Sequence, residues 1–194
     1  MNNMSDFIKF GDIDIINDLI SKHENNNLFL GYKALNSDLT NRYNKKYELF
    51  KTYHTDGTIK FGNNGNGFHM CTNVEDTLRY VNTFSEDISI CMIAGWGKYS
   101  EYNDDYYGYY DMYAYEYMQI IKILSKEDVL ELASNMPFYR LLRFLRDYKL
   151  EPSELEYLKK LYIDNQYILK RLEENENRNY FYNMKLERIK KLDK

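Results

Sequence analysis

The chain has 194 residues and a formal net charge of −4 at pH 7. This length suits one domain, or one domain with a helical extension, and the acidic balance argues against direct binding of nucleic-acid phosphates. Two cysteines cannot build a disulfide framework, the first residues are polar, and no apolar run approaches the roughly 20 residues that cross a bilayer. We therefore expect an intracellular protein in a reducing compartment, with no membrane partner.

The first part of the chain has the composition of a sheet with covering helices. Asp12 is placed to cap a short helix, because apolar residues recur behind it at helical spacing as far as Ile20. A second helix is expected from Asn73 to about Asn82. Clusters of Asn, Gly and Asp separate the segments with strand composition, which are 28–35, 47–53, 58–61, 67–71, 88–94 and about 110–124.

The part after Ser125 is predicted to be helical. Ser125 and Asp128 have the spacing of a capping box, and Ser153 and Glu156 repeat it directly behind Pro152. An apolar stripe at helical period follows each of the two starts, so these helices are expected to pack together.

An Asn-rich stretch, residues 174–183, is expected to interrupt the last helix before a charged end. Taken together, the patterns predict an α+β fold: a twisted, mostly antiparallel sheet core with covering helices, followed by a C-terminal helical extension. We place the core at 1–128 and the extension at 129–194.

His69 and Cys71 lie on the same side of a predicted strand. Two such residues do not make a zinc site, which needs three or four ligands, so no metal is expected. A Cys-His nucleophilic pair lacks a visible third group to orient it. The preferred interpretation is a packed histidine beside a buried thiol.

The stretch 99–117 holds nine of the 21 tyrosines beside five carboxylates and no basic residue. Within it, Tyr113, Tyr115 and Tyr117 alternate, which predicts three rings on one face of a strand and Glu116 on the other. Ordinary packing, with Glu116 facing water at a sheet edge, is the simpler alternative. The acidic, tyrosine-rich residues expected to contact a partner are Glu101, Asp104, Asp105, Tyr106, Tyr107, Tyr109, Tyr110 and Asp111.

Arg140, Arg143 and Arg146 recur every three residues and form a positive helix face. A solvated face explains such a pattern without any partner. A partner-binding role, toward an acidic protein or a single-stranded RNA backbone, is the alternative.

Three segments carry a resemblance. GYKALNSDLT (31–40), YELFKTYHTDGTIK (47–60) and GFHMCTNVEDTLRY (67–80) together resemble a family of short, uncharacterised proteins of Gram-positive bacteria and their phages. The resemblance covers about residues 30–128 and implies no known activity. It does imply a location in the cytoplasm of a bacterial host.

A weaker resemblance is to the ADP-ribosyltransferases of the diphtheria-toxin and poly-ADP-ribose polymerase type. Tyr32 would lie on their first strand, the GNGFH segment ending at His69 on their middle strand, and Glu116 in their late AYEYM-like strand. The resemblance implies NAD as cofactor and Glu116, His69 and Tyr32 as catalytic residues, with Glu116 stabilising an oxocarbenium-like state. The first strand lacks the family's His or Arg, and His69 stands where Tyr or Ser is usual.

Three functional hypotheses follow. The first is a phage- or mobile-element-related protein that binds and inhibits a host macromolecule, such as a nucleic-acid-handling defence complex, in the manner of anti-CRISPR proteins. Its acidic, tyrosine-rich surface would meet a host protein or ribonucleoprotein, and no cofactor is expected. The second is an ADP-ribosyltransferase-like enzyme that uses NAD to modify a host target. The third is an accessory domain whose tyrosines pack the core; the oligomeric state is left open.

Overall fold

The computed structural model describes residues 4–61, 65–81, 83–84, 87–102 and 112–192. The strands are β1 (Phe29–Asn36), β2 (Thr52–His54), β3 (Phe68–Cys71), β4 (Ile88–Glu101) and β5 (Met112–Ile123). The helices are α1 (Met4–Phe10), α2 (Ile13–His23), α3 (Val74–Thr77) with the 3-10 helix η1 (Leu78–Tyr80), α4 (Lys126–Ser134), α5 (Phe138–Asp147), α6 (Pro152–Leu161) and α7 (Gln166–Leu192). The predicted α+β class is confirmed.

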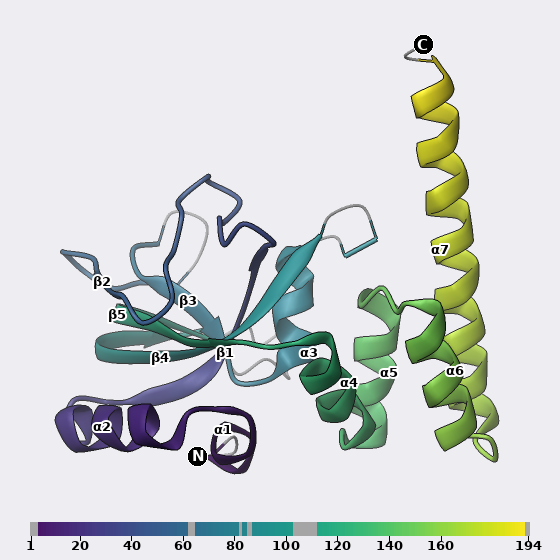
Figure 1. Ribbon diagram of the computed structural model, residues 1–194. Coiled ribbons are helices and arrows are strands. Elements are labelled where there is room, and N and C mark those ends of the chain that lie inside the picture. Colours follow the sequence, from purple (N-terminus) through teal and green to yellow (C-terminus); the bar gives the residue numbers. More distant parts are fainter. Residues whose placement is uncertain (1–3, 62–64, 82, 85–86, 103–111, 193–194) are drawn as a thin grey trace.

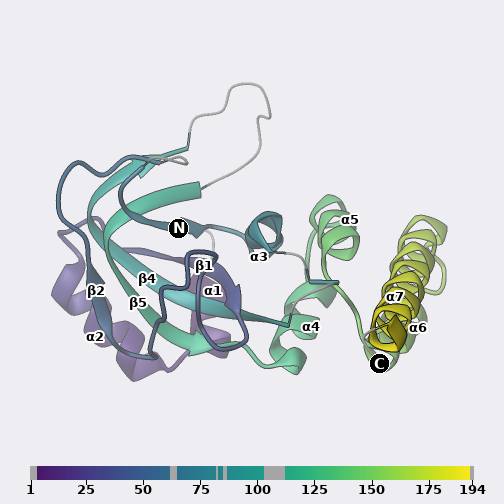
Figure 2. The same ribbon diagram turned by 90° about the horizontal axis from the view of Figure 1, so that it is seen from above.

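The five strands form one strongly curved sheet with the order β2-β5-β3-β1-β4, and every pairing between these strands is antiparallel. Strand β4 also pairs back with β5, so β5, β3, β1 and β4 form a closed ring with β2 attached at its edge. In Figures 1 and 2 the long strands β4 and β5 lie side by side. The ring leaves few unpaired strand edges.

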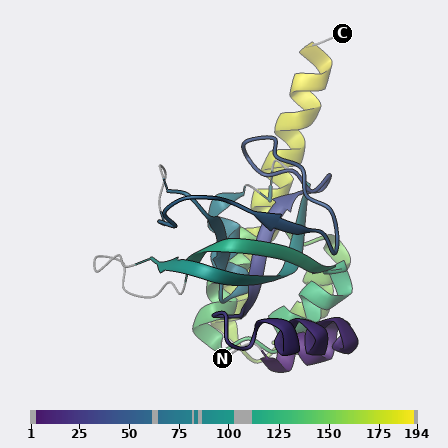
Figure 3. The same ribbon diagram turned by 90° about the vertical axis from the view of Figure 1, so that its left-hand side faces the viewer.

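Two hydrophobic clusters hold the fold together. One lies inside the curved sheet and draws side chains from β1, β3, β4 and β5 together with Tyr47. The other lies outside the sheet and joins it to α1, α2 and the C-terminal helices. Figure 3 shows α1 and α2, in purple, lying along this outer face.

Three of the four predicted helix starts are confirmed, at Asp12, at Asn73, which directly precedes α3, and at Ser125. Asp12 caps α2 by accepting from two backbone amides, and Ser125 forms a reciprocal capping box with Asp128. The capping box predicted at Ser153 was wrong, because Glu151 is the cap residue and its partner is Glu154. Pro152 at the first helical position fixes the start two residues earlier than the serine suggested.

The strand pattern was less accurate between β1 and β3. Residues 58–61 are not in a strand, and of 47–53 only the end belongs to β2. Phe50 turns the chain with φ of 62°, and the amide of Tyr47 donates to the carbonyl of Leu39 within the preceding loop. The segment therefore runs as loops around the sheet.

Helix α7 is continuous through the Asn-rich stretch, so the predicted interruption was wrong. Asn175 is buried, and its amide donates to the carbonyls of Leu145 and Tyr148 while its oxygen accepts from the amide of Leu150. The side chain of Asn175 thus forms hydrogen bonds to the turn between α5 and α6, and it does not end the helix. Although α7 has 27 residues, no helix in the described ranges is apolar enough over a sufficient length to cross a membrane.

Two ion pairs fasten the helical extension to the sheet core. Glu75 of α3 has no exposed side-chain surface and binds Arg140 of α5 through two contacts of 2.6 and 3.1 Å. Its neighbour Asp76, equally buried, pairs with Arg143. The outer cluster is continuous across the same junction: α5 packs against α3, and α6 and α7 lie beyond α5, farther from the sheet (Figure 1).

We predict that Arg140→Leu lowers the free energy of unfolding by about 3–5 kcal/mol, because Glu75 is left charged and buried without a partner. The matched control is Lys160→Gln, which removes an exposed pair with Glu156 and is expected to cost less than about 1 kcal/mol. Urea unfolding of both variants measures the difference. Equal losses would contradict a structural role for the buried pair.

Candidate ligand-binding site

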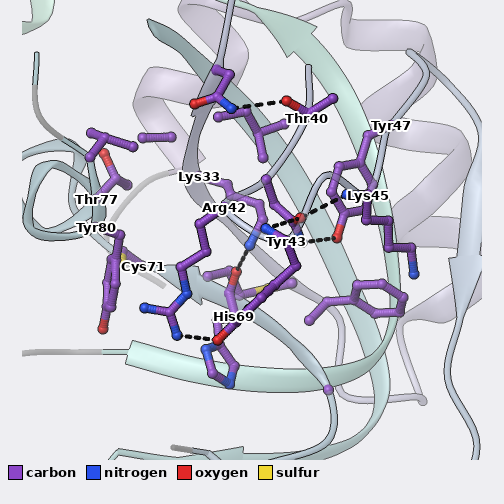
Figure 4. Close-up of a pocket in the computed structure, with 18 of the residues that line it drawn as sticks. Lys33, Thr40, Arg42, Tyr43, Lys45, Tyr47, His69, Cys71, Thr77 and Tyr80 are labelled. Carbon is purple, nitrogen blue, oxygen red and sulfur yellow. Dashed lines mark hydrogen bonds between the residues drawn. The ribbon is translucent and has the colours of Figure 1, made fainter. Parts of the chain in front are cut away.

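A pocket of about 710 Å³ opens beside β1 and β3 (Figure 4). Strand β1 contributes Lys33, and β3 contributes His69 and Cys71. The loop between β1 and β2 forms the facing wall, and Tyr80 of η1 closes one end. The pocket thus lies where β1 and β3 meet.

The loop wall, residues 40–47, is braced by its own side chains. The side-chain oxygen of Asn41 accepts from the backbone amides of Tyr43 and Lys45 at 2.9 and 3.0 Å. Asn44 has φ of 60°, a left-handed conformation that asparagine tolerates well. A guanidinium nitrogen of Arg42 donates to the hydroxyl of Tyr43 at 2.5 Å. This bracing sets the direction of the loop's basic side chains.

The pocket is positively charged although the chain is acidic. Lys33, Arg42 and Lys45 line it, and none of the described residues that line it is acidic. No ion pair within the described ranges includes any of the three. Burial, together with the positive charges of Arg42 and Lys45, lowers the pKa of Lys33 to about 8. The pocket therefore presents uncompensated positive charge.

Aromatic rings supply much of the remaining wall. The ring of Phe61 stacks on His69 with centroids 4.3 Å apart and an angle of 17° between the planes. The ammonium of Lys45 lies 4.7 Å from the ring centroid of Phe68, at the base of the loop. Tyr43 and Tyr80 are exposed at the rim. Flat rings beside cations suit a ligand that is both planar and anionic.

His69 is a neutral polar group in the pocket wall. Burial, with the nearby charges of Lys33 and Arg42, lowers its pKa to about 4. Its Nε2 atom is buried and has no hydrogen-bond partner among the described residues. A buried polar atom without a partner is costly, so this nitrogen is suited to a hydrogen bond with a bound ligand or water.

The two cysteines are not reactive in this setting. Burial raises the pKa of the Cys71 thiol, and burial raises that of Cys91 to about 12. Both therefore stay protonated near neutral pH, where a thiol is a poor nucleophile. Within the described ranges, no group of three His, Cys, Asp or Glu side chains is arranged to hold a metal ion.

The structure brings together two of the three residues expected from the transferase resemblance. Tyr32 and His69 both line the pocket, although the hydroxyl of Tyr32 donates to Asp6 of α1 at 3.1 Å. Glu116 does not line it. Its carboxylate accepts from the amide of Lys98 at 3.1 Å, which lowers its pKa.

The position of Glu116 has a structural cause. The β4–β5 ladder shifts register between Trp96 and Tyr99, so that two β4 residues face Glu116 alone in a bulge. Gly97 takes φ of 87° there, and a side chain on it would lie 2.8 Å from the Glu116 carboxylate. Glu116 fills the space that this bulge leaves open.

The bulge also corrects the predicted placement of the tyrosine rings. Tyr113 and Tyr115 pack with the cluster inside the sheet, whereas Tyr117 packs with the outer cluster and stacks on Trp96 with nearly parallel planes. The three rings are therefore not on one face. Strict alternation failed because the chain changes register between them.

The expected partner-binding residues have mixed positions. Asp104, Asp105, Tyr106, Tyr107, Tyr109, Tyr110 and Asp111 lie outside the described residues. Glu101 is exposed at the end of β4. Arg140 and Arg143 are engaged by Glu75 and Asp76, and Arg146 pairs with Asp147.

The sequence reasoning missed the basic residues of the pocket. Arg42 and Lys45 belong to the run NRYNKKY (41–47), in which basic and aromatic residues alternate with asparagine. Such a run beside a strand is a usable signal for an anion site. Lys33 follows Tyr32 in the GYK segment, which the transferase resemblance places on the first strand.

The geometry defines an α+β domain with a closed antiparallel sheet and a basic, aromatic pocket. The family described as "Domain of unknown function (DUF7666)" matches residues 29–130, just over half of the chain, and the chain belongs to this family. The matched range contains all five strands and every residue that lines the pocket. Neither a curated protein nor a solved structure matches the chain.

We predict that His69 makes stability fall in mild acid. Its folded pKa of about 4 lies below the ordinary histidine pKa of 6.5, so the unfolded chain binds a proton that the native state rejects. Unfolding free energy should therefore fall as the pH drops from about 6.5 to about 4, and His69→Gln should flatten this slope. Urea unfolding at several pH values measures it. The control is His54→Gln, whose side chain is 39% exposed; equal flattening in both variants would contradict the prediction.

Proposed function

We propose that this protein binds a small anionic ligand with a planar ring, of the nucleotide class, in the pocket beside β1 and β3. The observation that carries the proposal is the combination of three cations with no acidic lining residue. Phosphate groups satisfy this charge, and the rings of Phe61 and Tyr43 offer surfaces for a base.

The volume supports the same class of ligand. About 710 Å³ lies within the range of ordinary small-molecule and cofactor sites. The unpartnered Nε2 of His69 adds one neutral contact that discriminates among ring edges. Charge gives affinity in such a site, and the neutral contact gives specificity.

Binding without transfer is favoured by the position of the carboxylates. A transferase of the expected type needs a glutamate at the nicotinamide ribose, and the residues lining the pocket include none. NAD remains a member of the proposed ligand class, since it is planar and anionic. The transferase hypothesis stays a prediction that NAD labelling tests.

The interaction hypothesis also stays a prediction. It rests on the composition of the acidic, tyrosine-rich segment, most of which lies outside the described residues. Inhibition of a host complex and binding of a small ligand are compatible, because they would use different parts of the molecule.

We expect calorimetric titration with AMP, ADP and ATP to show binding that weakens as salt is added, with adenosine binding more weakly than AMP. The double variant Arg42→Gln/Lys45→Gln should lose roughly tenfold or more in affinity, since each charged contact is worth about 1.5–3 kcal/mol. Lys46→Gln is the matched control, because Lys46 is exposed and does not line the pocket. Equal affinities for the two variants would refute the proposed site.

A second experiment separates binding from transfer. Protein, labelled NAD and bacterial extract are mixed, and both transferred label and co-purifying partners are measured. We expect Glu116→Gln to keep the wild-type affinity for nucleotide within about twofold, because this residue does not line the pocket. Label transfer that disappears in Glu116→Gln would support the transferase, full transfer by that variant would exclude Glu116 as its catalytic residue, and a specific partner without label would support the interaction protein.

A further inference from the structure

Lys33 occupies an unusual place for a lysine. It lies on β1 within the sheet, opposite Cys91 of β4, and its amine enters the pocket and donates to the backbone carbonyl of His69 at 2.6 Å (Figure 4). None of the described residues that line the pocket is acidic, and the nearby charges of Arg42 and Lys45 have the same sign as that of Lys33. An amine in this setting is held without a counter-ion.

The same setting makes Lys33 the best nucleophile of the pocket. Near pH 8 about half of its amine is uncharged, a share roughly a hundredfold larger than that of an ordinary exposed lysine. The thiols of Cys71 and Cys91 are protonated and buried. An uncharged amine keeps one N–H for the His69 carbonyl and has a lone pair free for reaction.

We propose that the Lys33 amine forms an imine with the carbonyl carbon of an anionic aldehyde or ketone bound in this pocket. The nitrogen lone pair attacks the carbonyl carbon, and a proton passes from nitrogen to oxygen to give a carbinolamine. The C–O bond then breaks, the oxygen leaves as water with the second amine proton, and the C=N bond forms. The step needs no oxidant or reductant.

The remaining lining residues indicate why the carbonyl compound should be anionic and planar. Arg42 and Lys45 lie beyond the amine in the same pocket and can hold a phosphate or carboxylate. Phe61 and His69 form a stacked pair at the wall. The inference rests on the proposed function only for this docking of the anionic group.

The probe is pyridoxal 5′-phosphate, which combines an aldehyde, a planar ring and a phosphate. The full-length protein is mixed with one equivalent near pH 8 and reduced with borohydride, and its peptides are mapped by mass spectrometry. We expect Lys33 to carry at least about ten times the label of any other lysine, given its larger uncharged fraction. Lys46 in the same molecule is the internal control, being exposed and outside the pocket.

Three further measurements test the geometry. Pyridoxal, which lacks the phosphate, should label Lys33 at least roughly tenfold less, and Arg42→Gln/Lys45→Gln should lower labelling by pyridoxal 5′-phosphate to a similar extent. Lys33→Met should lose the imine absorbance, with its thermal midpoint recorded to show that it folds. Label spread evenly over exposed lysines, or equal labelling by the two probes, would overturn the inference.

Competition with AMP distinguishes this inference from the proposed function. AMP binding without selective labelling of Lys33 would leave the proposed function standing and overturn the imine. Selective labelling that AMP does not reduce would support the imine and refute nucleotides as ligands of the pocket.

Discussion

The pocket depends on how little β1 and β3 pair with each other. Strand β3 forms four register pairs with β5 but only one with β1, between Tyr32 and Cys71. A strand carbonyl that lacks a ladder partner needs another donor, and the amine of Lys33 bonds that of His69. The side chain of Lys33 thus bridges β1 and β3 at a place where backbone hydrogen bonds would otherwise have joined the two strands and left no pocket. This is why the opening lies there and why a side-chain donor stands in it.

The helical extension neutralises two acidic side chains that lie near this pocket. Helix α3 follows β3 directly and carries Glu75 and Asp76, whose charges reach the thiol of Cys71 at the pocket wall. Unpaired, these carboxylates would offset the cations of the pocket. Arg140 and Arg143 bind them from the outer side of the junction. Two of the three arginines that form a positive face in the sequence therefore balance buried acids, and the third pairs with Asp147. The positive charge available to a ligand comes from the loop 40–47 and from β1.

Much of the fold was predictable because its signals are local. Asp12 and the Ser125 capping box mark helix starts through contacts within four residues, and β1, β3 and β5 follow their composition closely. The failures involve distant partners. Asn175 belongs to a helix because its amide bonds carbonyls of another turn, and Tyr117 changes face because β4 bulges opposite it. The candidate site was predictable only in part for the same reason. Tyr32 and His69 stand in recognisable motifs, whereas Arg42 and Lys45 become pocket residues only because their loop folds over β1.

A lysine is not required merely to close the seam between β1 and β3. An uncharged donor such as an amide side chain would satisfy the His69 carbonyl, and it would avoid placing an ammonium group beside two other cations in a partly buried position. The charge is disfavoured there, so the amine is held near the point of losing its proton. What a lysine offers that an amide does not is a basic lone pair, oriented by the hydrogen bond that the same nitrogen donates. Lys33 therefore both joins β1 to β3 and supplies the nucleophile. Arg42 and Lys45, the cations that disfavour its proton, are also the groups that would bind an anionic reactant.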